Sequence, residues 1–180
     1  NGILVQGVAG ATGTVVHGGY PLRTNRCFYV THTNAVVDGF TMTGGRKDYG
    51  GGAYLNGGVW FLNSTIASNQ STVLGGGVYG YRCGGLSNCM VVANTAVQDG
   101  GGVSLREGGV VADCSLVGNT ARTDGGGAEC TDGGRTGPIA APVASAPARG
   151  RQGDRDDLGL AVGAGGVVVG GIRRPIPLVF

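Results

Sequence analysis

The sequence predicts an all-β fold, a single-stranded right-handed parallel β-helix with rungs of about 25 residues and an irregular C-terminal tail. Two repeating features support this, a glycine triplet and an asparagine that each return every 25 residues. The third observation is that no stretch of the chain shows the periodicity of a helix. The triplets lie at 50–52, 75–77, 100–102 and 125–127, and the asparagines are Asn69, Asn94 and Asn119.

Each repeat contains short strand-like runs separated by glycine corners, which is the plan of one rung of a coil. A strand that returns one rung later lies parallel to its predecessor, about 4.8 Å away, and bonds to it through the backbone. The preferred chirality of parallel crossovers favours a right-handed coil. The second half of the segment 34–45 aligns with 63–69 if one residue is inserted, so the repeats begin before the first triplet in a degenerate form.

Equivalent positions of successive repeats form columns along the axis. The aliphatic column of Ile66, Val91 and Leu116 is predicted to face the interior. Cys89 and Cys114 lie two positions before Val91 and Leu116, on the same face. They are close enough in this register for a disulfide, although a buried ladder of free thiols is favoured. The asparagine column is expected at a corner, in left-handed backbone, with amides bonded above and below.

The repeats can be followed through residues 1–134, and residues 135–180 form a second segment rich in Ala, Gly, Pro and Arg. Two interpretations of this tail are open. It is either a linker with an unrelated strand pair at 166–169 and 177–180, or out-of-frame translation of further repeats. The second is favoured, because Ala, Gly, Pro and Arg are encoded by GC-rich codons, and such a tail is expected to be disordered.

Composition restricts the function classes. The formal net charge is +2, too small to indicate nucleic acid as a partner. No apolar run is long enough for a transmembrane segment. No secretory signal is recognised at the start of the chain, and because it begins at Asn1 without an initiator Met, a fragment or a processed form is expected. Five cysteines leave at least one unpaired.

Five residues are candidates for an exposed binding face. Tyr54 and Tyr79 share one repeat position beside an inward-facing residue, so they are predicted to point outward with Tyr81 nearby. Stacked tyrosines could contact sugar rings or a protein partner, or they could simply stabilise neighbouring rungs. Arg46 and Lys47 are read as a contact for an acidic sugar or as a solvated loop.

Asp99 and Asp124 are candidates for a calcium site, because each precedes a glycine triplet and the two stack one rung apart. The nine-residue calcium-binding repeat is absent, which favours a column of turn aspartates instead. No zinc pattern and no phosphate-binding loop occurs, so no metal or other cofactor is expected. No catalytic residue is assigned.

The segments 26–30 and 37–45, together with the recurring glycine triplet and the Gly-Gly-Gly-Val-Tyr at 75–79, resemble the glycine-rich parallel β-helix repeat proteins of bacteria. These include the passenger domains of autotransporters and polymorphic outer-membrane proteins, and the resemblance covers residues 20–134. It implies an extracellular or cell-surface location, associated with the outer membrane. It also implies a structural or adhesive role toward host or matrix glycans or surface proteins. The alternative is a carbohydrate-active protein, similar to pectate lyases or polygalacturonases, or its non-catalytic part.

Overall fold

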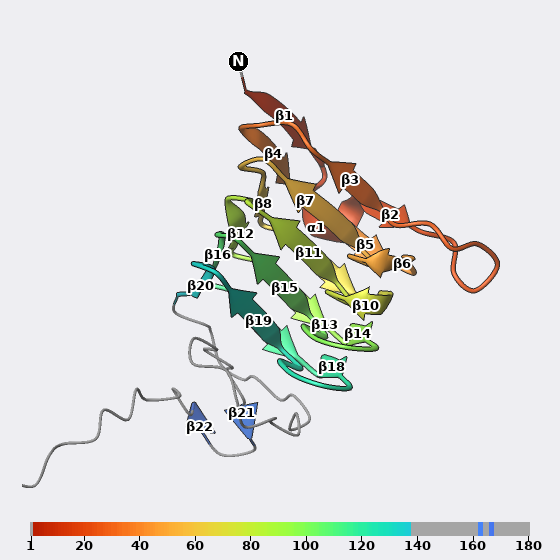
Figure 1. The fold of residues 1–180 in the computed structure, drawn as a ribbon. Helices are drawn as coiled ribbons and strands as arrows, with labels where there is room; N and C mark the ends of the chain where they lie inside the picture. Colours follow the sequence, from red (N-terminus) through yellow and green to blue (C-terminus); the bar gives the residue numbers. More distant parts are fainter. Residues whose placement is uncertain (1, 138–161, 164–165, 168–180) are drawn as a thin grey trace, which may run out of the picture.

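Four parallel sheets wrap around one core to form a β-solenoid of about five turns (Figure 1). The computed structural model describes residues 2–137, 162–163 and 166–167. The four sheets are named A to D, and from the second turn onward the chain passes through them in the order A, B, D and C. The predicted all-β parallel solenoid is therefore confirmed.

Sheets A and B form two of the walls. Sheet A contains β1 (Ile3–Gln6), β4 (Ala35–Asp38), β8 (Trp60–Leu62), β12 (Gly85–Ser87), β16 (Val110–Ala112) and β20 (Arg135–Thr136). Sheet B contains β2 (Val15–His17), β5 (Thr41–Thr43), β9 (Thr65–Ala67), β13 (Met90–Val92) and β17 (Ser115–Val117).

Sheets C and D complete each turn. Sheet C contains β3 (Phe28–Val30), β7 (Ala53–Asn56), β11 (Val78–Tyr81), β15 (Val103–Arg106) and β19 (Ala128–Thr131). Sheet D contains β6 (Arg46–Tyr49), β10 (Gln70–Leu74), β14 (Thr95–Ala96) and β18 (Thr120–Ala121). In the first turn no strand of sheet D forms, and the loop 18–27 leads from β2 to β3 instead.

The register reproduces the 25-residue period. Val78 pairs with Ala53 on one side and with Val103 on the other. Thr41 pairs with Thr65, 24 residues away, which confirms the one-residue offset of the degenerate repeat. The sequence analysis found no helix, but the first turn contains the single-turn helix α1 (Gly10–Gly13) between β1 and β2, closed by a backbone hydrogen bond from Thr14 to Gly10.

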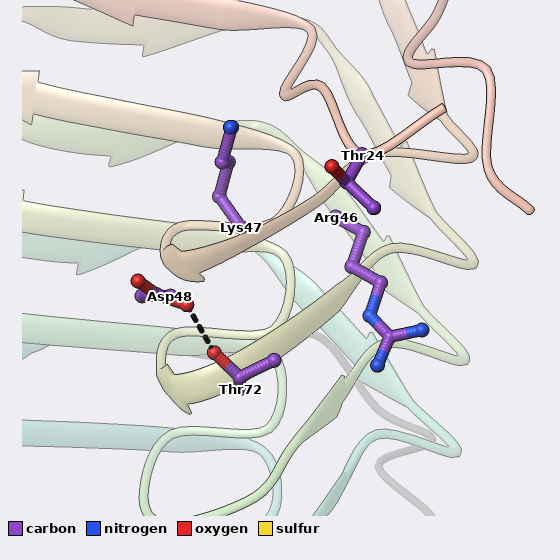
Figure 2. Close-up of a pocket in the computed structure, with 5 residues that line it drawn as sticks. All are labelled: Thr24, Arg46, Lys47, Asp48 and Thr72. Atoms are coloured by element: carbon purple, nitrogen blue, oxygen red, sulfur yellow. Dashed lines mark hydrogen bonds between the residues drawn. The ribbon is translucent and has the colours of Figure 1, made fainter.

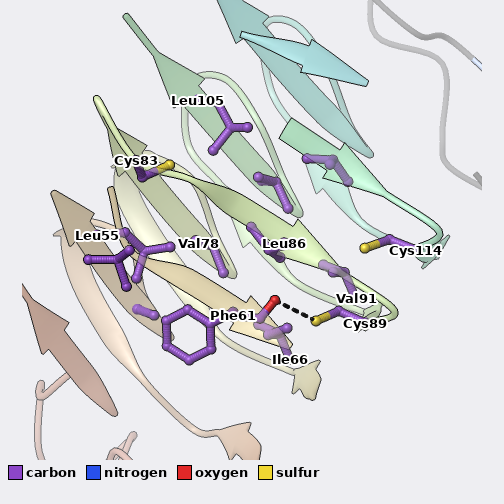
Figure 3. Close-up of a cluster of buried hydrophobic side chains, with 14 of the residues drawn as sticks. Leu55, Phe61, Ile66, Val78, Cys83, Leu86, Cys89, Val91, Leu105 and Cys114 are labelled. Atoms are coloured by element: carbon purple, nitrogen blue, oxygen red, sulfur yellow. Dashed lines mark hydrogen bonds between the residues drawn. The ribbon is translucent and has the colours of Figure 1, made fainter. Parts of the chain in front are cut away.

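The predicted interior columns form the core (Figure 3). Ile66, Val91 and Leu116 are buried in sheet B, and Met42 extends their column upward. Cys89 and Cys114 are buried and free, stacked in adjacent turns. The structure thus shows the ladder of thiols rather than a disulfide.

The glycine triplets form the corners between sheets D and C. The first glycine of each triplet has a positive φ, for example +65° at Gly75, a conformation that glycine adopts without strain. At the second position the turns approach so closely that a Cβ on Gly76 would lie 2.2 Å from the carbonyl oxygen of Gly101. Only glycine therefore allows adjacent corners to stack.

The asparagine column departs from the prediction in one respect. Left-handed backbone occurs one residue earlier, at Ser68, Ala93 and Gly118, with φ of 55°, 53° and 61°. The asparagines themselves are fully buried, and the amide of Asn94 bonds to the turns above and below, as predicted. The preceding residue makes the turn, and it thereby leaves the asparagine free to point inward.

Stacking continues two residues past Gly134, because Arg135 and Thr136 pair with β16. Beyond this, β21 (Val162–Gly163) and β22 (Gly166–Val167) form a short antiparallel pair. The remaining parts of the predicted tail strands, 168–169 and 177–180, lie outside the described residues. The division into segments at residue 134 and the nature of the tail remain predictions.

Candidate functional site

A ladder of three tyrosines runs along the outer face of sheet C. Tyr29, Tyr54 and Tyr79 are in register on β3, β7 and β11. Their ring centroids are 5.1 and 5.4 Å apart, and their ring planes are inclined by 21° and 26°. The outward orientation predicted for Tyr54 and Tyr79 is confirmed. Tyr29 was missed, although it lies 25 residues before Tyr54.

The stacking determines what this ladder presents to a partner. Both faces of the Tyr54 ring meet a neighbouring ring, so its edge and its hydroxyl group are what remain exposed. Tyr29 is 66% exposed, and no hydrogen bond within the described residues engages the hydroxyls of the three tyrosines. Burial against its neighbours raises the pKa of Tyr79. The ladder presents a row of donor and acceptor hydroxyls, which suits hydrogen bonding to a partner.

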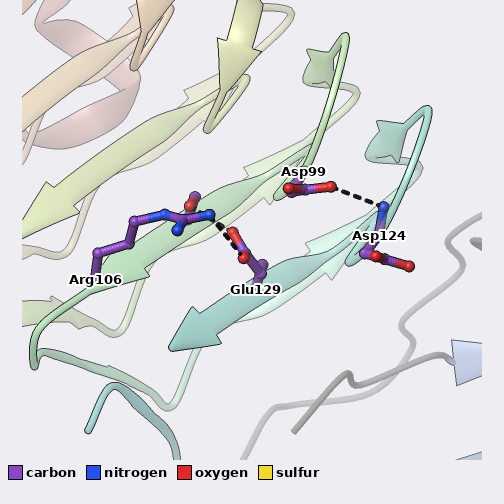
Figure 4. A network of polar contacts seen from close by, with 5 residues as sticks. Asp99, Arg106, Asp124 and Glu129 are labelled. Atoms are coloured by element: carbon purple, nitrogen blue, oxygen red, sulfur yellow. Dashed lines mark hydrogen bonds and ion pairs between the residues drawn. The ribbon is translucent and has the colours of Figure 1, made fainter. Parts of the chain in front are cut away.

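Beyond Tyr79, the same column continues for two turns as a buried polar cluster (Figure 4). In the same column, Ser104 donates to Oε2 of Glu129 at 2.7 Å. Arg106 lies in the neighbouring column, and its Nη2 contacts Oε1 of Glu129 at 3.1 Å. Since Ser104 and Glu129 are buried, this cluster stabilises the last turns rather than offering groups to a ligand.

The third tyrosine candidate is engaged within the protein. The hydroxyl of Tyr81 donates to Oε1 of Glu107 at 2.9 Å, and Arg82 forms an ion pair with the same carboxylate at 2.6 Å. The hydrogen bond raises the pKa of Tyr81, and the bonds from Tyr81 and Arg82 lower the pKa of Glu107. Tyr81 is therefore a weaker binding candidate than Tyr54.

A hollow of about 410 Å³ lies beside β6, lined by Thr24, Arg46, Lys47, Asp48 and Thr72 (Figure 2). Arg46 and Lys47 leave the strand in different directions and border the hollow on separate sides. The hydroxyl of Thr72 donates to the carboxylate of Asp48. The guanidinium of Arg46 lies 4.7 Å from the ring centroid of Tyr20, which holds it against the loop 18–27.

Arg26 connects the hollow with the tyrosine ladder. Its guanidinium carbon lies 5.4 Å from the ring centroid of Tyr29 and 5.3 Å from that of Tyr54, within the range of cation–π attraction. It also interacts electrostatically with Asp48, and burial lowers the pKa of Arg26. The sequence analysis did not select Arg26. The 25-residue period nevertheless aligns it with Gly51, so a large cation occupies a position that is glycine in the next turn.

Asp99 and Asp124 lie one turn apart, as predicted (Figure 4). The backbone N–H of Asp124 donates to Oδ1 of Asp99 at 3.1 Å, so Asp99 acts as a turn aspartate. Within the part of the chain that the structure describes, no group of three or more His, Cys, Asp or Glu side chains gathers in one place. The calcium hypothesis for Asp99 and Asp124 stays a prediction.

The geometry also bears on the enzyme alternative. Glycoside hydrolases require two carboxylates facing the scissile bond. The hollow has one among its lining residues, Asp48, and this carboxylate is bonded to Thr72. A base with an acidic partner, as lyases use, would need Lys47 or Arg46 directed at the same point as Asp48, whereas the three side chains diverge.

Comparison of the chain with known protein families, with curated proteins and with solved structures produced no match. Among the described residues, no helix has the length and apolarity needed to cross a membrane. Inference about function therefore rests on the surface of the solenoid itself.

Proposed function

We propose that this chain is a structural and adhesive repeat domain of a secreted or cell-surface protein, and that it binds a glycan or a surface protein through the outer face of sheet C. The parallel solenoid supports the structural part, because stacked turns build a long, rigid face from short repeats. An extracellular location, with the outer membrane of a bacterium as the setting, rests on the resemblance in the repeats.

The observation that carries the binding part is the exposed tyrosine ladder. A row of ring edges, each with an unengaged hydroxyl, repeats at the spacing of the turns. Tyrosine supplies apolar contact and hydrogen bonding together at a small cost in side-chain entropy. Only the first turns of sheet C carry tyrosine at this position. In later turns the same column contains Ser104 and Glu129.

Tyr54→Phe and Tyr79→Phe test this proposal, because phenylalanine keeps the stacking and removes only the hydroxyl. We expect the wild-type chain to be retained on surfaces coated with polysaccharide or with extracellular matrix protein, and the double variant to be retained less. Tyr20→Phe, in the loop 18–27, is the control. If the double variant is retained as well as wild type, the tyrosine hydroxyls are not part of the binding face. If the wild-type chain is not retained on any surface, the adhesive role is rejected.

A further inference from the structure

The first two turns depart from the chain's own repeat pattern in one place on the surface. In sheet D, Arg46 occupies the column filled by Gln70 in the next turn and by threonine in the turns after it. Lys47 occupies the column of Ser71 and then of alanine. These departures put two cations where later turns have small or neutral side chains.

Arg26 is the third departure. The backbone N–H of Cys27 donates to Gly52 as that of Gly52 donates to Gly77, so Cys27 corresponds to the last glycine of a triplet and Arg26 to the middle one. A position that is glycine in every later turn therefore has a guanidinium in the first. Departures from a repeat that cluster in space mark functional positions better than departures that scatter.

Two of the cations, Arg46 and Lys47, line the hollow beside β6, and the third, Arg26, interacts electrostatically with Asp48, which also lines it. The sheet ends at β6, and the loop 18–27 passes over this edge and contributes Thr24 to the hollow (Figure 2). The ion pairs formed within the described residues are Arg82–Glu107 and Arg106–Glu129, so none engages Arg26, Arg46 or Lys47. In addition, Nη1 of Arg26 is buried and has no hydrogen-bond partner among these residues.

We propose that this hollow and the adjoining tyrosine ladder bind an anionic polysaccharide, with the cations on its carboxylate or sulfate groups and the sugar along the tyrosine hydroxyls. This inference rests on the proposed adhesive function and names its ligand class. Guanidinium and ammonium groups recognise such anions through charge-assisted hydrogen bonds. Arg26 contacts both Tyr29 and Tyr54, so the charged and hydroxyl-bearing parts of the site are continuous.

Asp48 distinguishes a sugar from a simple anion. Its carboxylate faces the same hollow and repels a free sulfate or phosphate, but it accepts hydrogen bonds from sugar hydroxyls. The edge of β6 distinguishes a sugar from a peptide. The loop 18–27 already covers part of this edge, since the backbone N–H of Arg46 donates to the carbonyl of Asn25, and the lysine at position 47 also discourages the addition of an extended strand. A polymer with both anionic groups and hydroxyls fits this combination.

The test is calorimetric titration of the whole chain with heparin, polygalacturonate, dextran and inorganic sulfate. Heparin carries sulfate, polygalacturonate carries only carboxylate, and dextran is neutral. We expect the two anionic polymers to bind with an affinity that falls as salt is added, whereas dextran and inorganic sulfate do not bind. Arg26→Gly, Arg46→Gln and Lys47→Ser restore the residues of later turns, and each is expected to weaken binding about tenfold.

Arg122→Gln, which removes an exposed cation from the opposite end of the solenoid, is the matched control and should bind like wild type. Equal binding of dextran and polygalacturonate, or equal binding by Arg46→Gln and Arg122→Gln, would overturn the inference. So would capture of an extended peptide at the β6 edge. After any of these outcomes, the proposed adhesive function would still hold if the chain is retained on coated surfaces and this retention depends on the tyrosine hydroxyls. Loss of that retention would reject both.

Discussion

Asn69 and Asn94 are joined by two hydrogen bonds to one oxygen atom. The side-chain amide of Asn69 donates to Oδ1 of Asn94 at 3.0 Å, and its backbone N–H donates to the same atom at 2.9 Å. Asn94 and Asn119 repeat the arrangement one turn later. Because all three side chains are buried, this ladder satisfies backbone groups that the turn between sheets B and D would otherwise leave unpaired.

Asn94→Ala should destabilise the solenoid by about 3 kcal/mol or more. The change leaves the backbone N–H and side-chain amide of Asn69 without their acceptor, and it removes the donor to the carbonyl of Ile66. Each buried polar group left unpaired costs about 1–3 kcal/mol. Urea unfolding followed by circular dichroism measures the loss. Thr95→Ala, at the exposed next residue, is the control, and equal midpoints for both variants would contradict the role given to the ladder.

Gly76→Ala should be more damaging than its small size suggests. The added Cβ would lie 2.2 Å from the carbonyl oxygen of Gly101, a backbone atom that cannot move without shifting the next corner. We expect a loss of more than about 3 kcal/mol in the free energy of unfolding, or failure to fold. Gly118→Ser is the matched control, because its Cβ meets nothing within 4 Å and Ser68 already adopts this conformation in an earlier turn. If both variants unfold at the same urea concentration, close stacking does not explain the triplet.

Alkaline pH should weaken the fold through its buried thiols. Burial raises the pKa of Cys83 to about 11, above the value of 9.0 for an exposed thiol. A raised pKa means that the contribution to stability is complete below pH 9 and is lost as the pH rises toward 11. The loss from Cys83 is about 2 kcal/mol. Urea midpoints at pH 8 and pH 11 should differ more in wild type than in Cys83→Ala, and parallel curves would contradict this.

The repeat period predicts the solenoid well because each interior column is a property of the spacing alone. Ile66, Val91 and Leu116 could be placed from their numbers. The period also contained Tyr29 and Arg26, but the first turn lacks a glycine triplet, so its alignment was overlooked. The hollow could not be predicted, because it depends on the path of the loop 18–27 and on the strand missing from sheet D. The left-handed residue before each asparagine has no constant identity in the sequence, and it emerged only from backbone angles.

Tyr54→Ala should separate the structural role of the ladder from its binding role. Tyr54 stacks between Tyr29 and Tyr79, so its removal breaks two aromatic contacts. Each such pair contributes about 0.5–1.5 kcal/mol, and we expect a loss of about 1–3 kcal/mol in the free energy of unfolding. Tyr54→Phe should unfold like wild type while binding less. Equal stability of the alanine variant and wild type would show that the stacking contributes nothing to the fold.

Two substitutions in the cluster around Glu107 should shift the pKa of Tyr81 in opposite directions. The hydrogen bond to the Glu107 carboxylate raises the pKa of Tyr81, since the bond favours the protonated phenol, whereas the charge of Arg82 lowers it. Glu107→Gln removes the negative charge and should lower the pKa of Tyr81. Arg82→Gln removes the positive charge and should raise it. Ultraviolet titration of the phenols, with Tyr81→Phe to identify the band, measures both shifts. Shifts of the same sign would mean that Tyr81 does not contact this ion pair in solution, and Tyr81 would then return as a candidate for the binding face.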